Sequence, residues 1–163
     1  MRRTTGLLIS ALALTMGPGG TAAAADATVR ASGTFEAAVD FTTLQAIPSA
    51  HGHHCELIVR GTLTFAGTVD GEANGTTNAT VFAPCDEVLK APPGTFRDVF
   101  RFSGNFTGTV ERTSTTGELT YAGVTRPGGA IDANIRLHGS PRTVLRADAT
   151  IAVGGTYTGV AMP

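Results

Sequence analysis

The stretch "TFRDVFRFSGNFTGTVER", residues 95–112, alternates apolar and polar side chains over most of its length. One set of alternate positions carries Phe96, Phe100, Phe102, Phe106 and Val110. Arginine, serine, asparagine and threonine occupy most of the positions between them. Because successive side chains of a strand point to opposite faces, this pattern is typical of a long antiparallel strand with one buried face.

The same alternation occurs in "ELIVRGTLTFAGTVDG", residues 56–71, whose apolar face runs from Leu57 to Val69. Further strands are expected at residues 28–41, 75–83, 115–124, 130–138, 143–153 and 155–161. Turn-forming stretches such as "DGEANG" and "KAPPGT" separate them, and no segment after the N-terminal region has helical apolar spacing. About eight short strands predict an all-β domain, either a single antiparallel barrel or a β-sandwich.

Glycines inside the predicted strands favour the barrel. Glycine weakens a flat strand and is usually kept where a strand bends or bulges. Repeated glycines within strands therefore indicate strongly coiled strands that close on themselves. The glycines concerned are Gly61, Gly67, Gly104, Gly108, Gly123 and Gly159.

The N-terminal region has the three parts of a secretory signal peptide. Arg2 and Arg3 precede the apolar run "LLISALALTM", and "TAAAADA" then supplies small residues for cleavage. We expect residues 1–25 to be removed and residues 26–163 to form the barrel domain of a secreted protein, extracellular or associated with the cell envelope. The apolar run is too short to span a bilayer, and no later segment predicts a transmembrane span.

Charge argues against nucleic acid as a partner. Removing Arg2 and Arg3 from the twelve basic residues leaves ten against thirteen acidic ones, a net charge near −3. The remaining basic residues are scattered, and Lys90 is the sole lysine. Binding nucleic acid requires a clustered positive face, which this sequence does not predict.

The stretch "HGHHC", residues 51–55, allows two interpretations. In an exported protein, the two cysteines of the chain, Cys55 and Cys85, are first interpreted as a disulfide. With Cys85 at the end of the strand after a turn at "DGEANG", the two cysteines lie about four positions out of register, so a bulge or loop must bring them together. The alternative is a metal site, because alternate histidines of an extended segment can reach one zinc or copper ion. Its candidates are His51, His53 and His54.

Five charged residues lie within or beside the strands, and the sequence does not decide which face of the sheet they occupy. On the outer surface they would pair across strands. On the inner surface they would be polar contacts for a ligand. They are Glu56, Arg60, Arg97, Asp98 and Arg101.

The order of "ASGTF", "LTFAGTVDGEANGTTNATV", "FRFSGNFTGTVERTSTTGELTYAG" and "GGTYTGVA" resembles small bacterial proteins with an allene oxide cyclase-like barrel, relatives in fold of the dirigent proteins. The resemblance implies an eight-stranded antiparallel barrel with an apolar cavity, often in an oligomer. It supplies no catalytic residue, because no active-site motif of the family matches this sequence.

We therefore expect non-catalytic binding of a small apolar molecule inside the barrel, with no cofactor and possible homo-oligomerisation. The candidate wall residues are Phe65, Phe102, Phe106, Tyr121 and Tyr157. The same aromatic residues could instead fill a closed core. Two other functions stay open: a cyclase or isomerase, and a structural or interaction module of the cell envelope.

Overall fold

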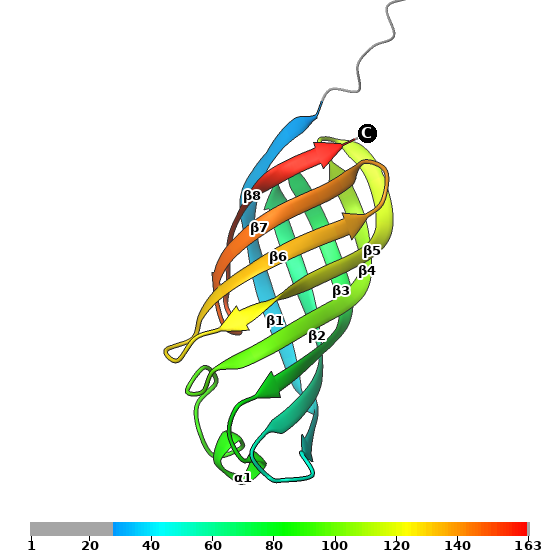
Figure 1. Cartoon of the computed structure of the whole chain (residues 1–163). Coiled ribbons are helices and arrows are strands. Elements are labelled where there is room, and N and C mark those ends of the chain that lie inside the picture. Colours follow the sequence, from blue (N-terminus) through cyan, green and yellow to red (C-terminus); the bar gives the residue numbers. More distant parts are fainter. Residues whose placement is uncertain (1–27, 163) are drawn as a thin grey trace, which may run out of the picture.

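The computed structural model describes residues 28–162, which form a closed barrel of eight antiparallel strands (Figure 1). Each strand pairs with the next along the chain, and β8 pairs with β1 to close the barrel. The prediction of an all-β antiparallel barrel of about eight strands is confirmed, and the sandwich is excluded. The strands are β1 Val29–Pro48, β2 Cys55–Gly67, β3 Val69–Val81, β4 Asp98–Val110, β5 Thr113–Thr125, β6 Ala130–His138, β7 Arg142–Thr150 and β8 Gly154–Met162.

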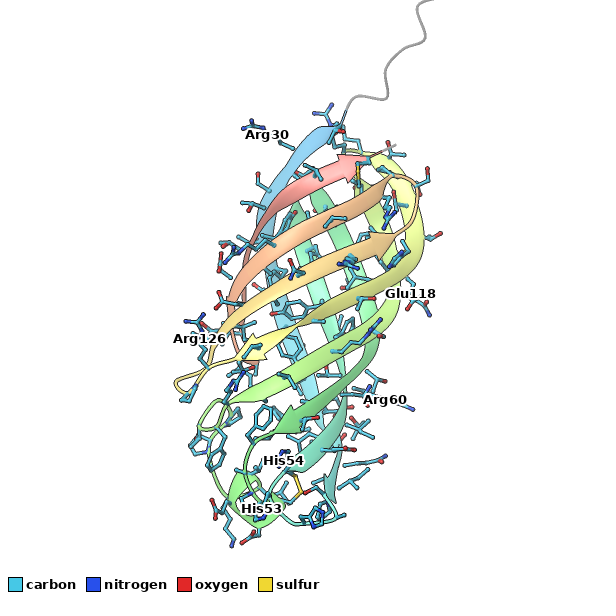
Figure 2. All side chains as sticks on the ribbon, viewed as in Figure 1. Arg30, His53, His54, Arg60, Glu118 and Arg126 are labelled. Atoms are coloured by element: carbon cyan, nitrogen blue, oxygen red, sulfur yellow. A yellow bond between two sulfur atoms is a disulfide. The ribbon has the colours of Figure 1, made fainter. Side chains whose placement is uncertain are left out.

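The alternation seen in the sequence separates the inside of the barrel from the outside. In β4, Phe102, Phe106 and Val110 are buried, whereas Arg101 and Asn105 are exposed. Figure 2 shows Arg30, Arg60, Glu118 and Arg126 extending away from the barrel wall. The hydrophobic core is thus the interior of a single closed sheet.

One half of the interior is filled by packed aromatic rings. The ring of Phe65 lies 6.1 Å from that of Phe106 and 6.0 Å from that of Tyr157, both edge to face. It also stacks on Phe35 at 5.7 Å. Edge-to-face pairs add stability beyond the area they bury. We call Phe35, Phe65, Phe106 and Tyr157 the aromatic layer; their rings fill this half of the barrel.

Facing glycines make room for the aromatic rings. Gly75 of β3 pairs with Gly104 of β4. A Cβ atom on Gly75 would lie 2.6 Å from the Cα of Gly104 and 2.8 Å from the ring of Phe102. Glycine at these positions therefore allows the two strands and an inward-facing ring to come close together.

The turn predicted at "DGEANG", residues 70–75, is wrong. β2 and β3 are joined at Thr68, and Phe65 pairs with Gly71. Gly67 has a φ of 123°, a backbone conformation that glycine adopts without the steric penalty of a side chain. The glycines of residues 70–75 thus belong to the inside of a strand, where they serve close packing.

The chain departs from the predicted elements in two further places. β1 continues to Pro48, beyond the predicted end at residue 41. After β3 a four-residue helix, α1 (Cys85–Val88), begins at the cysteine that was expected to end a strand. Both differences lie at the same end of the barrel, which also holds the candidate site (Figure 1).

Candidate functional site

The half of the barrel nearest α1 is hollow. It contains a cavity of about 490 Å³ between the aromatic layer and the α1 end. Its lining is largely aliphatic and aromatic and includes Phe35, Leu57, Leu63, Phe100, Phe102 and Ile131. Cavities of this size and character are typical of sites for small molecules.

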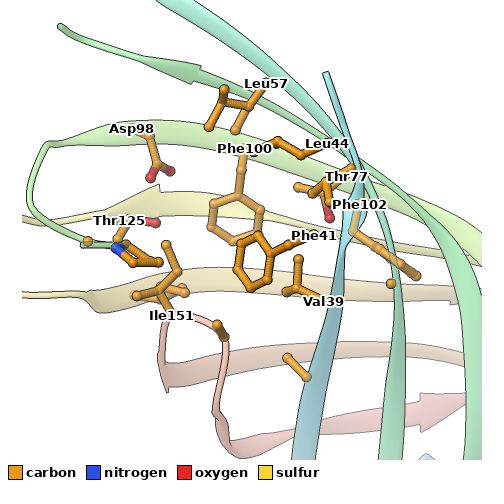
Figure 3. Close-up of a pocket in the computed structure, with 18 of the residues that line it drawn as sticks. Val39, Phe41, Leu44, Leu57, Thr77, Asp98, Phe100, Phe102, Thr125 and Ile151 are labelled. Atoms are coloured by element: carbon orange, nitrogen blue, oxygen red, sulfur yellow. The ribbon is translucent and has the colours of Figure 1, made fainter. Parts of the chain in front are cut away.

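A bulge in β1 shapes one side of the mouth. β1 advances from Asp40 to Gln45 while β2 advances only from Arg60 to Ile58, so the two strands lose their regular pairing there. The extra residues place Phe41 and Leu44 in the cavity lining (Figure 3). Bulges commonly redirect side chains at binding sites, and this one adds two apolar groups to the wall.

Asp40 stabilises the bulge. Its carboxylate accepts a hydrogen bond from the backbone N–H of Thr42 at 3.1 Å. Its backbone carbonyl accepts another from the Thr43 hydroxyl at 2.8 Å, and that hydroxyl accepts one from the N–H of Arg60 at 2.9 Å. Local side-chain hydrogen bonds thus replace part of the missing ladder.

The connection between β3 and β4 covers part of the mouth. We call residues 82–97 the cap segment; it contains α1, and Leu89, Pro93 and Phe96 within it line the cavity. The disulfide between Cys55 and Cys85, with Cα atoms 4.7 Å apart, attaches the cap segment to the start of β2. The predicted disulfide is therefore present, and the short helix is the loop structure that brings the cysteines together.

Three backbone hydrogen bonds continue around the mouth. The N–H of Gly128 donates to the carbonyl of Gly94 in the cap segment at 2.9 Å. The N–H of Ile151 donates to Gly129 at 2.9 Å, and the N–H of Ala37 donates to Val153 at 3.1 Å. Together with the disulfide, these contacts connect β2, the cap segment, the β5–β6 turn, the β7–β8 turn and β1.

Two buried side chains of the lining each have a polar atom without a hydrogen-bond partner. Asp98 is 6% exposed and Tyr121 is 5% exposed. Within residues 28–162, neither the Oδ1 atom of Asp98 nor the hydroxyl of Tyr121 has a hydrogen-bond partner. Both residues line the cavity, so its largely apolar wall contains two polar atoms without a hydrogen-bond partner. Buried polar groups in proteins are normally paired, which makes these two notable.

The surroundings of both groups disfavour their charged forms. Burial raises the pKa of Asp98, and hydrogen bonding with the side chain and backbone of Thr125 only partly offsets this. Burial likewise raises the pKa of Tyr121. Tyr121 therefore keeps its proton at neutral pH, and Asp98 keeps its proton to higher pH than an exposed aspartate.

The structure decides which face of the sheet each of the five charged residues occupies. Of the five strand charges, Glu56, Arg60, Arg97 and Arg101 are exposed, although Arg60 also contributes to the cavity rim. Asp98 faces inward, so the inner-surface alternative applies to this residue. The sequence contained a signal for this location. Asp98 lies two residues from both Phe96 and Phe100, and alternate residues of a strand point to the same face.

The five predicted wall residues divide into two groups. Phe102 and Tyr121 line the cavity. Phe65, Phe106 and Tyr157 are buried in the filled half and are absent from the lining. The prediction missed Phe35, Phe41 and Phe100, which also line the cavity. Phe35, Phe41 and Phe100 all lie at inward-facing alternate positions of their strands, and Phe41 is the first residue of the β1 bulge.

The histidines of residues 51–54 lie at the end of the barrel that carries the cap segment. His51, His53 and His54 are exposed, and the ring of His54 lies 5.3 Å from that of Phe82 (Figure 2). Cys55 is held in the disulfide and offers no thiolate. Within residues 28–162, histidine, cysteine, aspartate and glutamate side chains form no group of three that could hold a metal ion.

Large exposed apolar side chains gather at the same end. Phe41 is 55% exposed and Leu89 is 57% exposed, and both also line the cavity. Ile47, Phe82 and Val153 are further exposed apolar residues of this end. The mouth thus presents an apolar rim that continues into the apolar cavity, a favourable route for a water-insoluble molecule.

The predicted signal peptide lies in residues 1–25, outside the described residues. Among residues 28–162, no helix is both long enough and apolar enough to cross a membrane. Searches against protein-family models, curated proteins and solved structures found no match to this chain, so the resemblance to allene oxide cyclase-like barrels stays a prediction.

Proposed function

We propose that this protein is a secreted binding protein that holds a small, largely apolar molecule inside its barrel. The observation that supports this most directly is the cavity of about 490 Å³ behind an apolar rim. A barrel of eight strands is just wide enough either to be filled by side chains or to hold one small ligand. This barrel is filled in one half and hollow in the other.

Blocking the cavity tests the proposal. Ala79 of β3 lines the cavity, whereas Ala66 of β2 is exposed on the outer surface. We expect Ala79→Phe to weaken binding of the neutral fluorescent probe Nile red by about tenfold or more, because the new ring occupies the space of the ligand. The matched change Ala66→Phe should leave binding as it is in the wild-type protein. Equal binding by all three proteins would show that the probe adheres elsewhere and would refute the proposal.

A second candidate function, catalysis by a cyclase or isomerase, has one specific observation in its favour. Asp98 is a buried carboxyl group whose raised pKa suits proton transfer, and it opens into an apolar cavity. Mass spectrometry of molecules extracted from the wild-type protein and from Asp98→Asn separates the two functions. The same molecule in both proteins supports binding alone, whereas a different isomer retained by Asp98→Asn supports catalysis.

Native mass spectrometry of protein exported by its own host extends these tests. A bound small molecule of constant mass would support the proposed ligand. The same spectrum gives the subunit number and thereby tests the predicted homo-oligomer. It also shows the processed mass, which tests the predicted secretion.

A further inference from the structure

The cavity contains one buried carboxyl group, that of Asp98, near its mouth. Asp98 is the first residue of β4, next to the cap segment, and Phe100 and Phe102 follow it on the same face toward the interior. Figure 3 shows the Asp98 carboxylate beside Phe100 and Thr125. A ligand that enters through the apolar rim therefore meets a carboxyl group near the mouth and aromatic walls further in.

No basic side chain neutralises this carboxyl group. Within residues 28–162, the three ion pairs are Lys90–Asp86, Arg126–Asp132 and Arg146–Asp132, and none includes Asp98. Arg60, the other charged residue of the lining, is exposed at the rim. A buried carboxylate is costly unless an opposite charge accompanies it. An ionised Asp98 would therefore need a positive charge that none of these ion pairs supplies, and a cationic ligand can provide it.

The aromatic rings on the same wall as Asp98 also favour a positively charged ligand. The rings of Phe100 and Tyr121 lie 5.0 Å apart, edge to face, and Tyr121 makes a second such contact with Phe35 at 5.4 Å. Phe41 adds a ring from the β1 bulge (Figure 3). Ring faces attract ammonium groups, and a carboxylate combined with aromatic walls is a favourable site for an organic cation.

We infer that the cavity takes an apolar amine, bound as its ammonium form with the nitrogen at Asp98 and the hydrocarbon part against Phe100, Phe102 and Phe35. This inference rests on the proposed function and identifies its ligand class. The Asp98 carboxylate accepts a hydrogen bond from the ammonium group. Binding of the cation also favours the ionised carboxylate, whose formation burial otherwise opposes.

Three ligands with the same tail and different heads provide the test. Octylamine, octan-1-ol and octanoate are compared by their displacement of Nile red from the wild-type protein at neutral pH. A charged hydrogen bond is stronger than a neutral one, so we expect octylamine to bind about tenfold more tightly than the alcohol. Octanoate should bind most weakly, because a second carboxylate would lie beside Asp98.

Two variants show whether the preference comes from Asp98. Asp98→Asn removes the charge with little change in shape and should bring the affinities for octylamine and octan-1-ol within about threefold of each other. Asp148→Asn removes the same charge from the exposed face of β7 and should keep the preference. Thermal melting of each variant confirms that it is folded, and the comparison of ligands on the wild-type protein needs no variant.

The outcomes separate the inference from the proposed function. A preference for octylamine that Asp98→Asn abolishes and Asp148→Asn keeps supports the inference. If octan-1-ol binds as tightly as octylamine, or if Nile red binds in the cavity and none of the three ligands displaces it, the amine is wrong and the binding function stands. If Ala79→Phe also leaves Nile red binding unchanged, the proposed function fails as well.

Discussion

Tyr157 and Tyr121 are the two tyrosines of the chain, and their hydroxyl groups differ in one respect. Both side chains are buried. The Tyr157 hydroxyl accepts a hydrogen bond from the backbone N–H of Val69 at 3.0 Å and lies within donating distance of two carbonyls, Val69 at 3.0 Å and Ala66 at 3.3 Å. The Tyr121 hydroxyl has no partner within residues 28–162. Replacing each tyrosine by phenylalanine removes a hydrogen-bonded hydroxyl in one case and a hydroxyl without a partner in the other.

We expect Tyr157→Phe to lower the free energy of unfolding by about 1–3 kcal/mol. The substitution leaves the N–H of Val69, a residue that is 1% exposed, without its partner, and a buried donor left unpaired costs about that much. Tyr121→Phe should be neutral or slightly stabilising, because it removes a buried hydroxyl that makes no hydrogen bond.

Urea unfolding with the disulfide intact measures both effects. A lower transition midpoint with an unchanged slope reports a change in stability rather than in the surface exposed on unfolding. The wild-type protein and Tyr121→Phe should unfold at similar urea concentrations, and Tyr157→Phe at a clearly lower one. If the two variants agree within about 0.5 kcal/mol, the hydroxyl of Tyr157 does not stabilise the β2–β3 connection, and the reasoning is wrong.

Three further predictions concern the disulfide, the buried carboxyl group and processing. Replacing both Cys55 and Cys85 by serine should lower the unfolding free energy by about 3.6 kcal/mol, from the entropy of closing a loop of sequence separation 30, and urea unfolding measures it. Because the folded state holds the Asp98 proton to a higher pH than the unfolded state, the stability of the wild-type protein relative to Asp98→Asn should fall as pH rises from 3.8 through the raised folded-state pKa and then level off. If the unfolding free energy of the wild-type protein minus that of Asp98→Asn stays constant or rises over that range, the inward location of the carboxyl group is wrong. The intact mass of secreted protein should match a chain beginning at Asp26, and a full-length chain kept inside the cell would refute the signal peptide.

The strand pattern and the closed barrel could be predicted from the sequence, because alternation depends on local residue order. The inward parity that predicts Phe102 and Tyr121 as wall residues also applies to Phe65 and Phe106. Parity distinguishes inside from outside and contains no information about height along the barrel axis. The division into a filled half and a hollow half was therefore beyond this reasoning.

The cavity itself depends on features that do not repeat along the chain. The β1 bulge adds Leu44 out of phase with the strand. The cap segment adds Leu89 and Pro93 from a connection in which only a turn was predicted. The turn error at residues 70–75 has a related cause. Glycine marks both turns and close strand contacts, and Gly75 serves the second role because it faces Gly104.

The pairing of β1 with β8 has a consequence for the growing polypeptide. The register joins Val29 to Ala161 and Glu36 to Gly154, so the first strand finds its second neighbour only when the last nine-residue strand exists. Until then the edges of β1 and β7 are open to pairing with other chains, which is a known route to aggregation during biogenesis. A chain that stops before Gly154 would keep both edges permanently. Synthesis of β8 is therefore required before the barrel can close, because β8 pairs with the free edges of both β1 and β7.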